Sequence, residues 1–309
     1  MKILVTGIGG QLGHDVALEL VKQGHEAVGT VRKRPGTLPA CTAVCLDITD
    51  EARVKRLITE SRPDAVIHCA AWTAVDAAED RENREAVFRT NVLATRNIAE
   101  AAKSVGAKML YISTDYVFGG DGTDPRQPDD KNFAPLNVYG RSKLEGELAV
   151  CGATENFFIV RTEWLFGGNG NNFVRTMLNA GKTQETVRVV NDQIGTPTYT
   201  ADLARLLADI VMTEKYGYYH ATNAETQPGE YISRYAFARE IFRQAGLRTA
   251  VVPVTTAEYG PGRAQRPLNS RLDKDKLAEA GFCPLPDWKD ALARYLAGTG
   301  EKREWDKLK

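Results

Sequence analysis

Tyr139 and Lys143 are residues whose types and spacing would allow them to perform chemistry together. They are four positions apart, so on a helix the phenol and the ammonium would lie on the same side. A cation a few ångströms away favours the phenolate and lowers the pKa of a tyrosine, so Tyr139 would pass a proton near neutral pH. The same spacing also fits a tyrosine packed in the core beside a lysine that points to solvent. Both interpretations stay open on this pair alone.

The residues around the pair predict a helix that begins near residue 138. Pro135 keeps the preceding chain extended, and Asn137 is of a type favoured at the N-cap. Leu144, Leu148 and Val150 supply an apolar face. Tyr139 and Lys143 therefore fall in the first turns of this helix.

The composition excludes several classes of protein. The 309 residues, 43% of them hydrophobic, are enough for a large core with a smaller lobe. Forty basic residues balance forty acidic ones, which argues against nucleic acid or an anionic membrane as the partner. The cysteines form no Cys-x-x-Cys pair, and Cys41 and Cys45 have no histidine near them, so neither a disulfide framework nor a metal site is predicted. No stretch approaches the ~18 apolar residues of a membrane span, and a soluble cytoplasmic protein is expected.

The N-terminus has the pattern of a dinucleotide-binding turn. An apolar strand at 2–6 runs into Gly7, Gly10 and Gly13, and a helix then closes at Gly24. Glycines at this spacing allow a tight turn, let backbone amides approach a pyrophosphate and let the helix pack on the strand. A plain glycine-rich turn is the alternative, but the strand-turn-helix setting favours a dinucleotide.

The residues after the second strand, 26–31, indicate which dinucleotide binds. A site for NAD usually has Asp or Glu there to hold the ribose hydroxyls, whereas this chain has Arg32, Lys33 and Arg34. Guanidinium and ammonium groups suit a 2′-phosphate, so NADPH is favoured and NADH remains the alternative. A solvated basic loop would have the same composition.

Further apolar strands predict the fold class. Runs at 42–46, 65–69, 108–113 and 157–161 alternate with helical patterns such as 84–105. This alternation predicts an α/β fold, a Rossmann-type doubly wound parallel sheet with a smaller C-terminal α/β substrate lobe. Ligands bind at the carboxyl ends of such strands, where Thr114 would hold a substrate oxygen, although Thr also commonly ends a strand. His68 and His220 are expected in the core, and Asn91 either faces inward or lies on the solvent side.

The second half of the chain changes to shorter elements. A strand is expected at 187–190, a Thr200-capped helix returns to the main domain, and a strand at 218–221 and a helix at 232–245 follow. We expect a Rossmann domain of residues 1–165 and about 186–215, and a lobe of about 166–185 and 216–309. Helices from 273 to 280 and from 288 to 296 complete the lobe, and the tail 298–309 is expected to fray.

Together these motifs resemble those of the extended short-chain dehydrogenases/reductases, and of the dTDP-4-dehydrorhamnose reductases in particular. The likeness covers nearly the whole chain, and its last three motifs are far more specific than the glycines. The motifs are the glycines at 7, 10 and 13, Asp47-Ile48, Ala71-Trp72-Thr73, the run 113–118, Tyr139 to Lys143, the run 161–164, the run 192–198 and the run 266–273.

The resemblance implies an NADPH-dependent reductase acting on a nucleotide-linked 4-keto sugar, whose product, dTDP-L-rhamnose, is a donor for bacterial surface polysaccharide. Tyr139 would donate the proton, Thr114 would support it, and Lys143 would bind the nicotinamide ribose while lowering the tyrosine's pKa. The cofactor would contact Gly7, Gly10, Gln11, Leu12, Gly13, Arg32, Asp47, Ile48, Ala71, Trp72 and Thr73. The substrate would contact Thr114, Asp115, Tyr116, Trp164 and Arg266. For Arg266 a structural ion pair is an equal alternative.

The chain also departs from the family pattern. Trp72 stands where Tyr or His is usual, Glu163 where Ser is common and Gly119 where Asp is usual. Some members form a dimer with Mg²⁺ held by glutamates, one of them early in the first helix. Here that position is Asp15, a shorter carboxylate, so Mg²⁺ and the choice between monomer and homodimer stay open.

Two other functions remain as alternatives. A nucleotide-sugar dehydratase or epimerase of the same superfamily is one, but a dehydratase would have Asp-Glu after the threonine, and this chain has Asp115-Tyr116. The other is a non-catalytic NADP-binding regulatory subunit, a role that a relative of these reductases takes. Turnover distinguishes this alternative from an enzyme.

Overall fold

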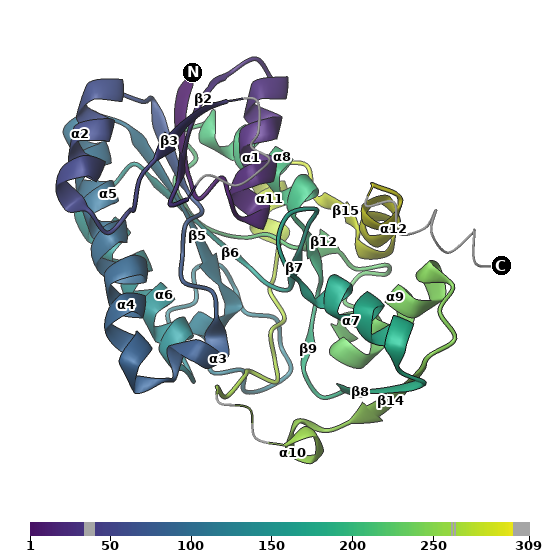
Figure 1. The fold of residues 1–309 in the computed structure, drawn as a ribbon. Helices are drawn as coiled ribbons and strands as arrows, with labels where there is room; N and C mark the ends of the chain where they lie inside the picture. The colour runs from purple at the N-terminus through teal and green to yellow at the C-terminus, as the bar shows by residue number, and fades with distance from the viewer. Residues whose placement is uncertain (34–40, 261, 263, 299–309) are drawn as a thin grey trace.

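The structure is a computed structural model that describes residues 1–33, 41–260, 262 and 264–298. Figure 1 shows a sheet with helices on both sides and a smaller lobe beside it. The elements in chain order are β1 (Lys2–Thr6), α1 (Gln11–Lys22), β2 (Glu26–Val31), β3 (Thr42–Cys45), α2 (Glu51–Ser61), β4 (Ala65–His68), α3 (Val75–Ala78), η1 (Arg81–Asn83), α4 (Arg84–Phe88), η2 (Arg89–Leu93), α5 (Ala94–Ser104), β5 (Lys108–Thr114), η3 (Asp115–Val117), α6 (Val138–Ala153), β6 (Phe157–Thr162), β7 (Leu165–Phe166), α7 (Phe173–Thr183), β8 (Thr186–Val190), β9 (Ile194–Gly195), β10 (Thr198–Tyr199), α8 (Thr200–Val211), β11 (Gly217–His220), β12 (Asn223–Ala224), β13 (Ile232–Ser233), α9 (Arg234–Ala245), β14 (Ala250–Val254), α10 (Thr256–Tyr259), α11 (Asp275–Glu279), β15 (Leu285–Asp287) and α12 (Trp288–Gly298).

The main sheet has seven strands in the order β11-β6-β5-β4-β1-β2-β3, all of them parallel. From β1 the chain first builds the sheet in one direction through β2 and β3, then in the other through β4, β5 and β6. The reversal lies between β1 and β4, where Ile3 pairs with Ala65. A reversal of this kind opens a crevice at the carboxyl ends of the strands. The predicted doubly wound parallel sheet is confirmed.

Helices bury both faces of this sheet. Successive side chains of a strand point to opposite faces, so Ile3 and Val5 join the core under α1 and α8, whereas Leu4 joins the core under α2 and α5. Strands that are buried on both faces appear as continuous apolar runs in the sequence. No helix in the described part of the chain is long and apolar enough to cross a membrane.

The turn between β1 and α1 depends on close backbone packing. Gly7 has a φ of +75°, which L side chains rarely adopt. A Cβ at Gly13 would lie 2.4 Å from the Gly7 carbonyl oxygen, so α1 begins tightly against the turn. The N-terminus of α1 thereby lies at the ligand-binding edge of the sheet.

The lobe has its own core, made by α7, α9 and α12 around Phe166 and Phe237. Two strands belong to a different domain from the one in which each was predicted. The strand predicted at 218–221 for the lobe is β11, which pairs with β6 in the main sheet. The strand predicted at 187–190 for the main domain is β8, which pairs with β14. These pairings join segments distant in sequence, which local patterns do not reveal.

Three predicted helices also differ in detail. The stretch 84–105 contains a π-helical turn, η2, between α4 and α5. Thr200 does not cap α8, because its hydroxyl donates to Asp15 at 2.5 Å and Tyr199 takes the N-cap position. The helix expected from residue 232 begins at Arg234, with Ser233 as its cap. Arg34 and the tail from 299 lie outside the described residues.

A buried ion pair joins β6 to α6. Arg161 Nε and Nη2 donate to the two carboxylate oxygens of Glu147 at 2.9 and 2.8 Å, and both side chains are at most 1% exposed. Removing one partner of such a pair leaves the other charge buried and uncompensated.

We expect Arg161→Met to lower the free energy of unfolding by about 3–5 kcal/mol, because Glu147 then stays buried without its counterion. Urea denaturation measures this loss. Arg56→Met is the matched control, since Arg56 pairs with Glu60 only at the surface, where both are more than 70% exposed. A loss in the Arg161 variant no larger than in the control would contradict this.

Candidate active site

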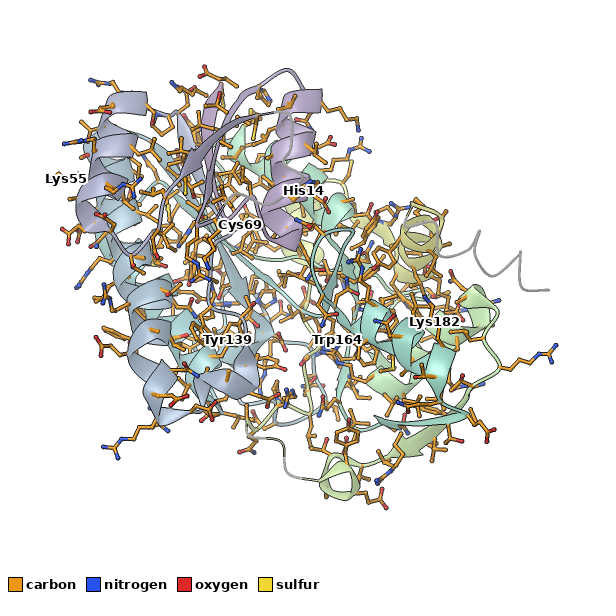
Figure 2. The ribbon with its side chains drawn as sticks, viewed as in Figure 1. His14, Lys55, Cys69, Tyr139, Trp164 and Lys182 are labelled. Carbon is orange, nitrogen blue, oxygen red and sulfur yellow. The ribbon has the colours of Figure 1, made fainter. Side chains whose placement is uncertain are left out.

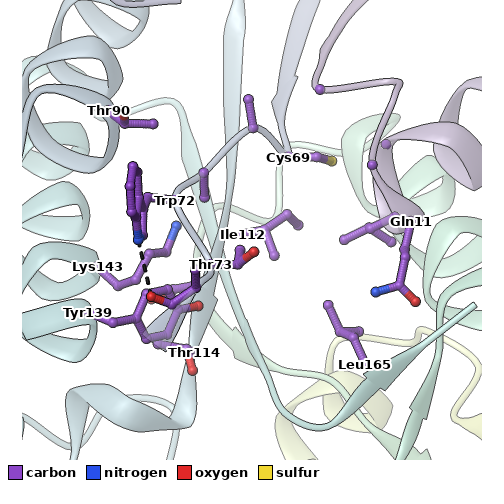
Figure 3. A pocket seen from close by; sticks show the side chains of 18 of the residues that line it. Gln11, Cys69, Trp72, Thr73, Thr90, Ile112, Thr114, Tyr139, Lys143 and Leu165 are labelled. Atoms are coloured by element: carbon purple, nitrogen blue, oxygen red, sulfur yellow. Dashed lines mark hydrogen bonds between the residues drawn. The ribbon is translucent and has the colours of Figure 1, made fainter. Parts of the chain in front are cut away.

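The carboxyl ends of the strands and the lobe enclose a cavity of about 800 Å³. Figure 3 shows it with Tyr139, Lys143 and Thr114 toward one end and Gln11 toward the other. Every predicted site residue except Arg266 lines it. The structure therefore brings together segments that were singled out separately in the sequence: residues 7 to 13, Arg32, Asp47 and Ile48, residues 71 to 73, residues 114 to 116, Tyr139, Lys143 and Trp164.

Helix α6 positions Tyr139 and Lys143 as predicted. The Asn137 side chain accepts a hydrogen bond from the Gly140 backbone N–H at 2.7 Å, which confirms the predicted cap. A Cβ at Gly140 would lie 2.3 Å from the Tyr116 carbonyl oxygen, so α6 begins against the end of β5. Figure 2 places Tyr139 beside the sheet and Trp164 nearer the lobe.

The pKa of Tyr139 is shifted in the opposite direction to the one predicted. Burial raises the pKa of the Tyr139 phenol above its ordinary value, the Asp115 charge raises it further, and a hydrogen bond with Thr114 only partly opposes them. Burial also lowers the pKa of Lys143 to about 7, and its ammonium lies 4.0 Å from the centroid of the Tyr111 ring. Tyr139 is therefore a phenol that carries its proton at neutral pH.

Asn91 ties the cofactor side of the cavity to α6, a role the sequence left undecided. Its side chain faces inward from the π-helical turn η2, accepts from the Trp72 backbone N–H at 2.7 Å and donates to the Trp72 carbonyl at 3.1 Å. It also donates to Ser142 at 2.9 Å, and Ser142 donates to the Tyr139 carbonyl at 2.7 Å. The amphipathic pattern around Asn91 carried no signal for this chain of contacts.

Two buried carboxyl groups lie on the lobe side of Tyr139. Asp115 accepts hydrogen bonds from Thr114 at 2.9 Å and from Ser270 at 2.5 Å, and burial raises its pKa to about 6. Glu163 accepts from the Thr196 backbone N–H at 2.9 Å. Burial and the nearby Asp115 charge raise the pKa of Glu163 well above its ordinary value.

The structure changes which arginine belongs to the cavity. Arg266, predicted for substrate, is absent from the lining and forms an ion pair with Asp76 at 2.7 Å, which was the alternative interpretation. Arg234 does line the cavity, with its guanidinium 3.9 Å from the centroid of the Trp164 ring. The sequence around Arg234 resembles any helix start, so nothing marked it as a site residue.

The other end of the cavity is suited to the adenosine half of a dinucleotide. Arg32 and Lys33 line it beside Asp47 and Ile48. A hydrogen bond from the Thr49 backbone N–H lowers the pKa of Asp47, with smaller contributions from Arg32 and Arg89. This carboxylate therefore stays charged.

A lobe loop holds the glycine turn from outside the cavity. Asn169 donates to the Gly9 carbonyl at 3.0 Å, and Gln11 donates to the Asn171 carbonyl at 3.1 Å. The glycine turn and the lobe are thereby joined.

Asp15, the position compared with a metal-binding glutamate, makes protein contacts. Its carboxylate accepts from Thr200 and lies 3.3 Å from His14 Nδ1. Within the described ranges, no group of three or more His, Cys, Asp or Glu side chains could hold a metal ion.

The raised pKa of Asp115 makes stability depend on pH. The unfolded carboxyl titrates near ~4 and the folded one at about 6, so its proton stabilises the fold fully below pH ~4 and this contribution is lost as the pH rises through about 6. We expect the melting temperature of the wild type, relative to Asp115→Asn, to be lower at pH 8 than at pH 5. Thermal melts measure this difference, and an equal difference at both pH values would contradict the pKa.

Comparisons with known proteins agree with this geometry. The family model described as "RmlD substrate binding domain" matches residues 1–300. The dTDP-4-dehydrorhamnose reductase of Mycolicibacterium smegmatis is 38% identical over 300 residues, covering 96% of this chain and 86% of that protein. The dTDP-4-keto-6-deoxy-D-glucose reductase of Streptomyces niveus is 35% identical over 292 residues, covering 94% of this chain and 95% of that protein.

A solved structure shares the whole fold. The dTDP-4-dehydrorhamnose reductase of Bacillus anthracis, determined in complex with NADP, superposes with a TM-score of 0.87 at 40% identity and covers 97% of this chain and 100% of that chain. The chain belongs to the dTDP-4-dehydrorhamnose reductase family.

Proposed function

We propose that this protein reduces the C4 keto group of dTDP-4-dehydro-L-rhamnose with NADPH, giving dTDP-L-rhamnose. The observation that carries the proposal is the convergence of Tyr139, Lys143 and Thr114 in one cavity with the glycine turn. The names of the relatives support the substrate, since several are dTDP-4-dehydrorhamnose reductases.

The residues of the cavity fit an NADP cofactor. A Cβ at Gly7 would lie 2.9 Å from the Ala70 backbone, so only glycine fits at this point of the turn. A glycine turn of this kind lets the backbone approach a pyrophosphate closely. Arg32 lines the cavity, and its guanidinium would suit the 2′-phosphate of NADP. When bound, the cofactor supplies the hydride that reduces the carbonyl carbon.

The chain's own residues supply the proton and the geometry. Tyr139 holds a proton at its phenol oxygen, because its raised pKa keeps it neutral, and gives that proton to the substrate oxygen as the carbonyl becomes an alcohol. Thr114 orients the same oxygen. Lys143, with a pKa of about 7, returns a proton to the tyrosinate. Its ammonium also holds the nicotinamide ribose.

NADPH oxidation followed at the nicotinamide absorbance tests the proposal. The substrate is dTDP-4-dehydro-L-rhamnose generated in place, and dTDP-4-dehydro-6-deoxyglucose is the comparison because one relative is named for its reduction. Rapid oxidation with the first sugar alone is the expected result. Binding of NADPH without its oxidation in the presence of either sugar would instead favour the regulatory subunit.

We expect Tyr139→Phe to lower kcat by roughly 10²–10⁴ while NADPH affinity stays the same, because the variant loses only the proton donor. Stopped-flow oxidation and a fluorescence titration with NADPH measure the two quantities. Tyr259→Phe, on an exposed tyrosine, is the control. An unchanged rate in the Tyr139 variant would remove Tyr139 from the mechanism.

The choice of NADPH over NADH depends on Arg32. We expect Arg32→Ala to raise the KM for NADPH roughly 10-fold or more and to leave the KM for NADH unchanged, since only NADPH has the 2′-phosphate. Arg53→Ala is the control, because Arg53 donates to the Cys45 carbonyl and does not line the cavity. Equal changes for both cofactors would contradict this role.

A further inference from the structure

Arg234 places an aromatic-stacked cation in the substrate half of the cavity. Its guanidinium carbon lies 3.9 Å from the centroid of the Trp164 ring and 5.3 Å from that of Phe173. When a guanidinium lies over an aromatic ring, the ring contacts the face of the planar group. The N–H groups, which lie in the guanidinium plane, then remain available to a ligand.

The Arg234 guanidinium makes no direct ion pair or hydrogen bond with any of the described residues. The Asp115 and Glu163 charges act on it, but their carboxyl oxygens accept hydrogen bonds from other groups. Asp115 accepts from Thr114 and Ser270, and Glu163 accepts from Thr196. A desolvated cation without a direct ion pair is costly, and an anionic ligand group in contact with it would reduce that cost.

The position of Arg234 distinguishes it from the other cations of the site. Arg32 and Lys33 lie at the adenosine end, and Lys143 lies over Tyr111. Arg266 is paired with Asp76. The groups whose charges act on Arg234 are Tyr116, Glu163, Asp115 and Arg266, and none of these belongs to the glycine turn.

Trp164, whose ring contacts Arg234, has an unusual backbone conformation. Its φ is +49°, in the left-handed region that bulky residues rarely adopt. The Trp164 carbonyl accepts from the Thr198 backbone N–H at 3.2 Å, which ties the residue to the lobe strand β10. Strain of this kind is typically found at ligand-binding positions.

We propose that Arg234 binds the diphosphate of the nucleotide-sugar substrate, with Trp164 fixing the plane of its guanidinium. This inference rests on the proposed function for the nature of the substrate. A planar guanidinium offers paired donors that match phosphate oxygens, and the sugar would then extend from the diphosphate toward Thr114 and Tyr139.

Calorimetric titration of dTDP into the NADP⁺-loaded protein tests the assignment. We expect Arg234→Gln to weaken dTDP binding roughly 10- to 100-fold and Arg234→Lys to weaken it less, because lysine keeps the charge but loses the paired donors. Arg239→Gln is the matched control on the same helix, since Arg239 is exposed and stacks only on Tyr235. Arg266→Gln tests the competing arginine.

Kinetics and cofactor binding give a second readout. We expect Arg234→Gln to raise the KM for the nucleotide sugar far more than it lowers kcat, to leave NADPH affinity unchanged, and not to lower the melting temperature. Unchanged dTDP affinity in Arg234→Gln, or a larger loss in Arg266→Gln, would overturn the assignment even if the enzyme turns over. Binding of dTDP through Arg234 without NADPH oxidation would contradict only the proposed reaction.

Discussion

Desolvation of the cavity between the sheet and the lobe sets the protonation of the groups that face it. Burial raises the pKa of Tyr139 and lowers that of Lys143 to about 7. It also raises the pKa of Asp115 to about 6 and that of Glu163 well above its ordinary value. The cavity therefore presents a protonated phenol, a lysine that titrates near neutral pH and an arginine that makes no direct ion pair with any of the described residues. A reaction that adds a hydride to a carbonyl needs a proton donor of this kind beside it.

The fold creates this environment by bringing the ends of the parallel strands against a lobe built from later segments. Gly7 and Gly13 let α1 begin against the end of β1, and Gly140 does the same for α6 against the end of β5. Asn91 and Ser142 then link the loop after β4 to the start of α6. From the lobe side, Ser270 reaches Asp115. Each contact joins segments that are far apart in the sequence.

Local patterns were enough to predict the sheet class, the glycine turn and the Asn137 cap, and the family resemblance supplied many of the predicted residues that line the cavity. They failed where the outcome depends on packing. The pKa of Tyr139 is raised where a lowered value was predicted, because burial and the Asp115 charge both disfavour the phenolate. Arg266 was named for the substrate with a structural ion pair as an equal alternative, and Arg234 was not singled out, since sequence does not show which arginine meets a carboxylate. The pairing of β8 with β14 was also missed, because local patterns do not show which distant strands pair.

The central claim is that hydride is transferred to C4 of a nucleotide-linked keto sugar while Tyr139 protonates the C4 oxygen. The most direct test is to supply NADPH carrying deuterium at its transferable C4 position, with dTDP-4-dehydro-L-rhamnose generated in place, and to locate the deuterium in the product by NMR. The account predicts one deuterium at C4 of the rhamnosyl group. Product without deuterium at C4, or an unchanged keto sugar beside bound cofactor, would contradict it.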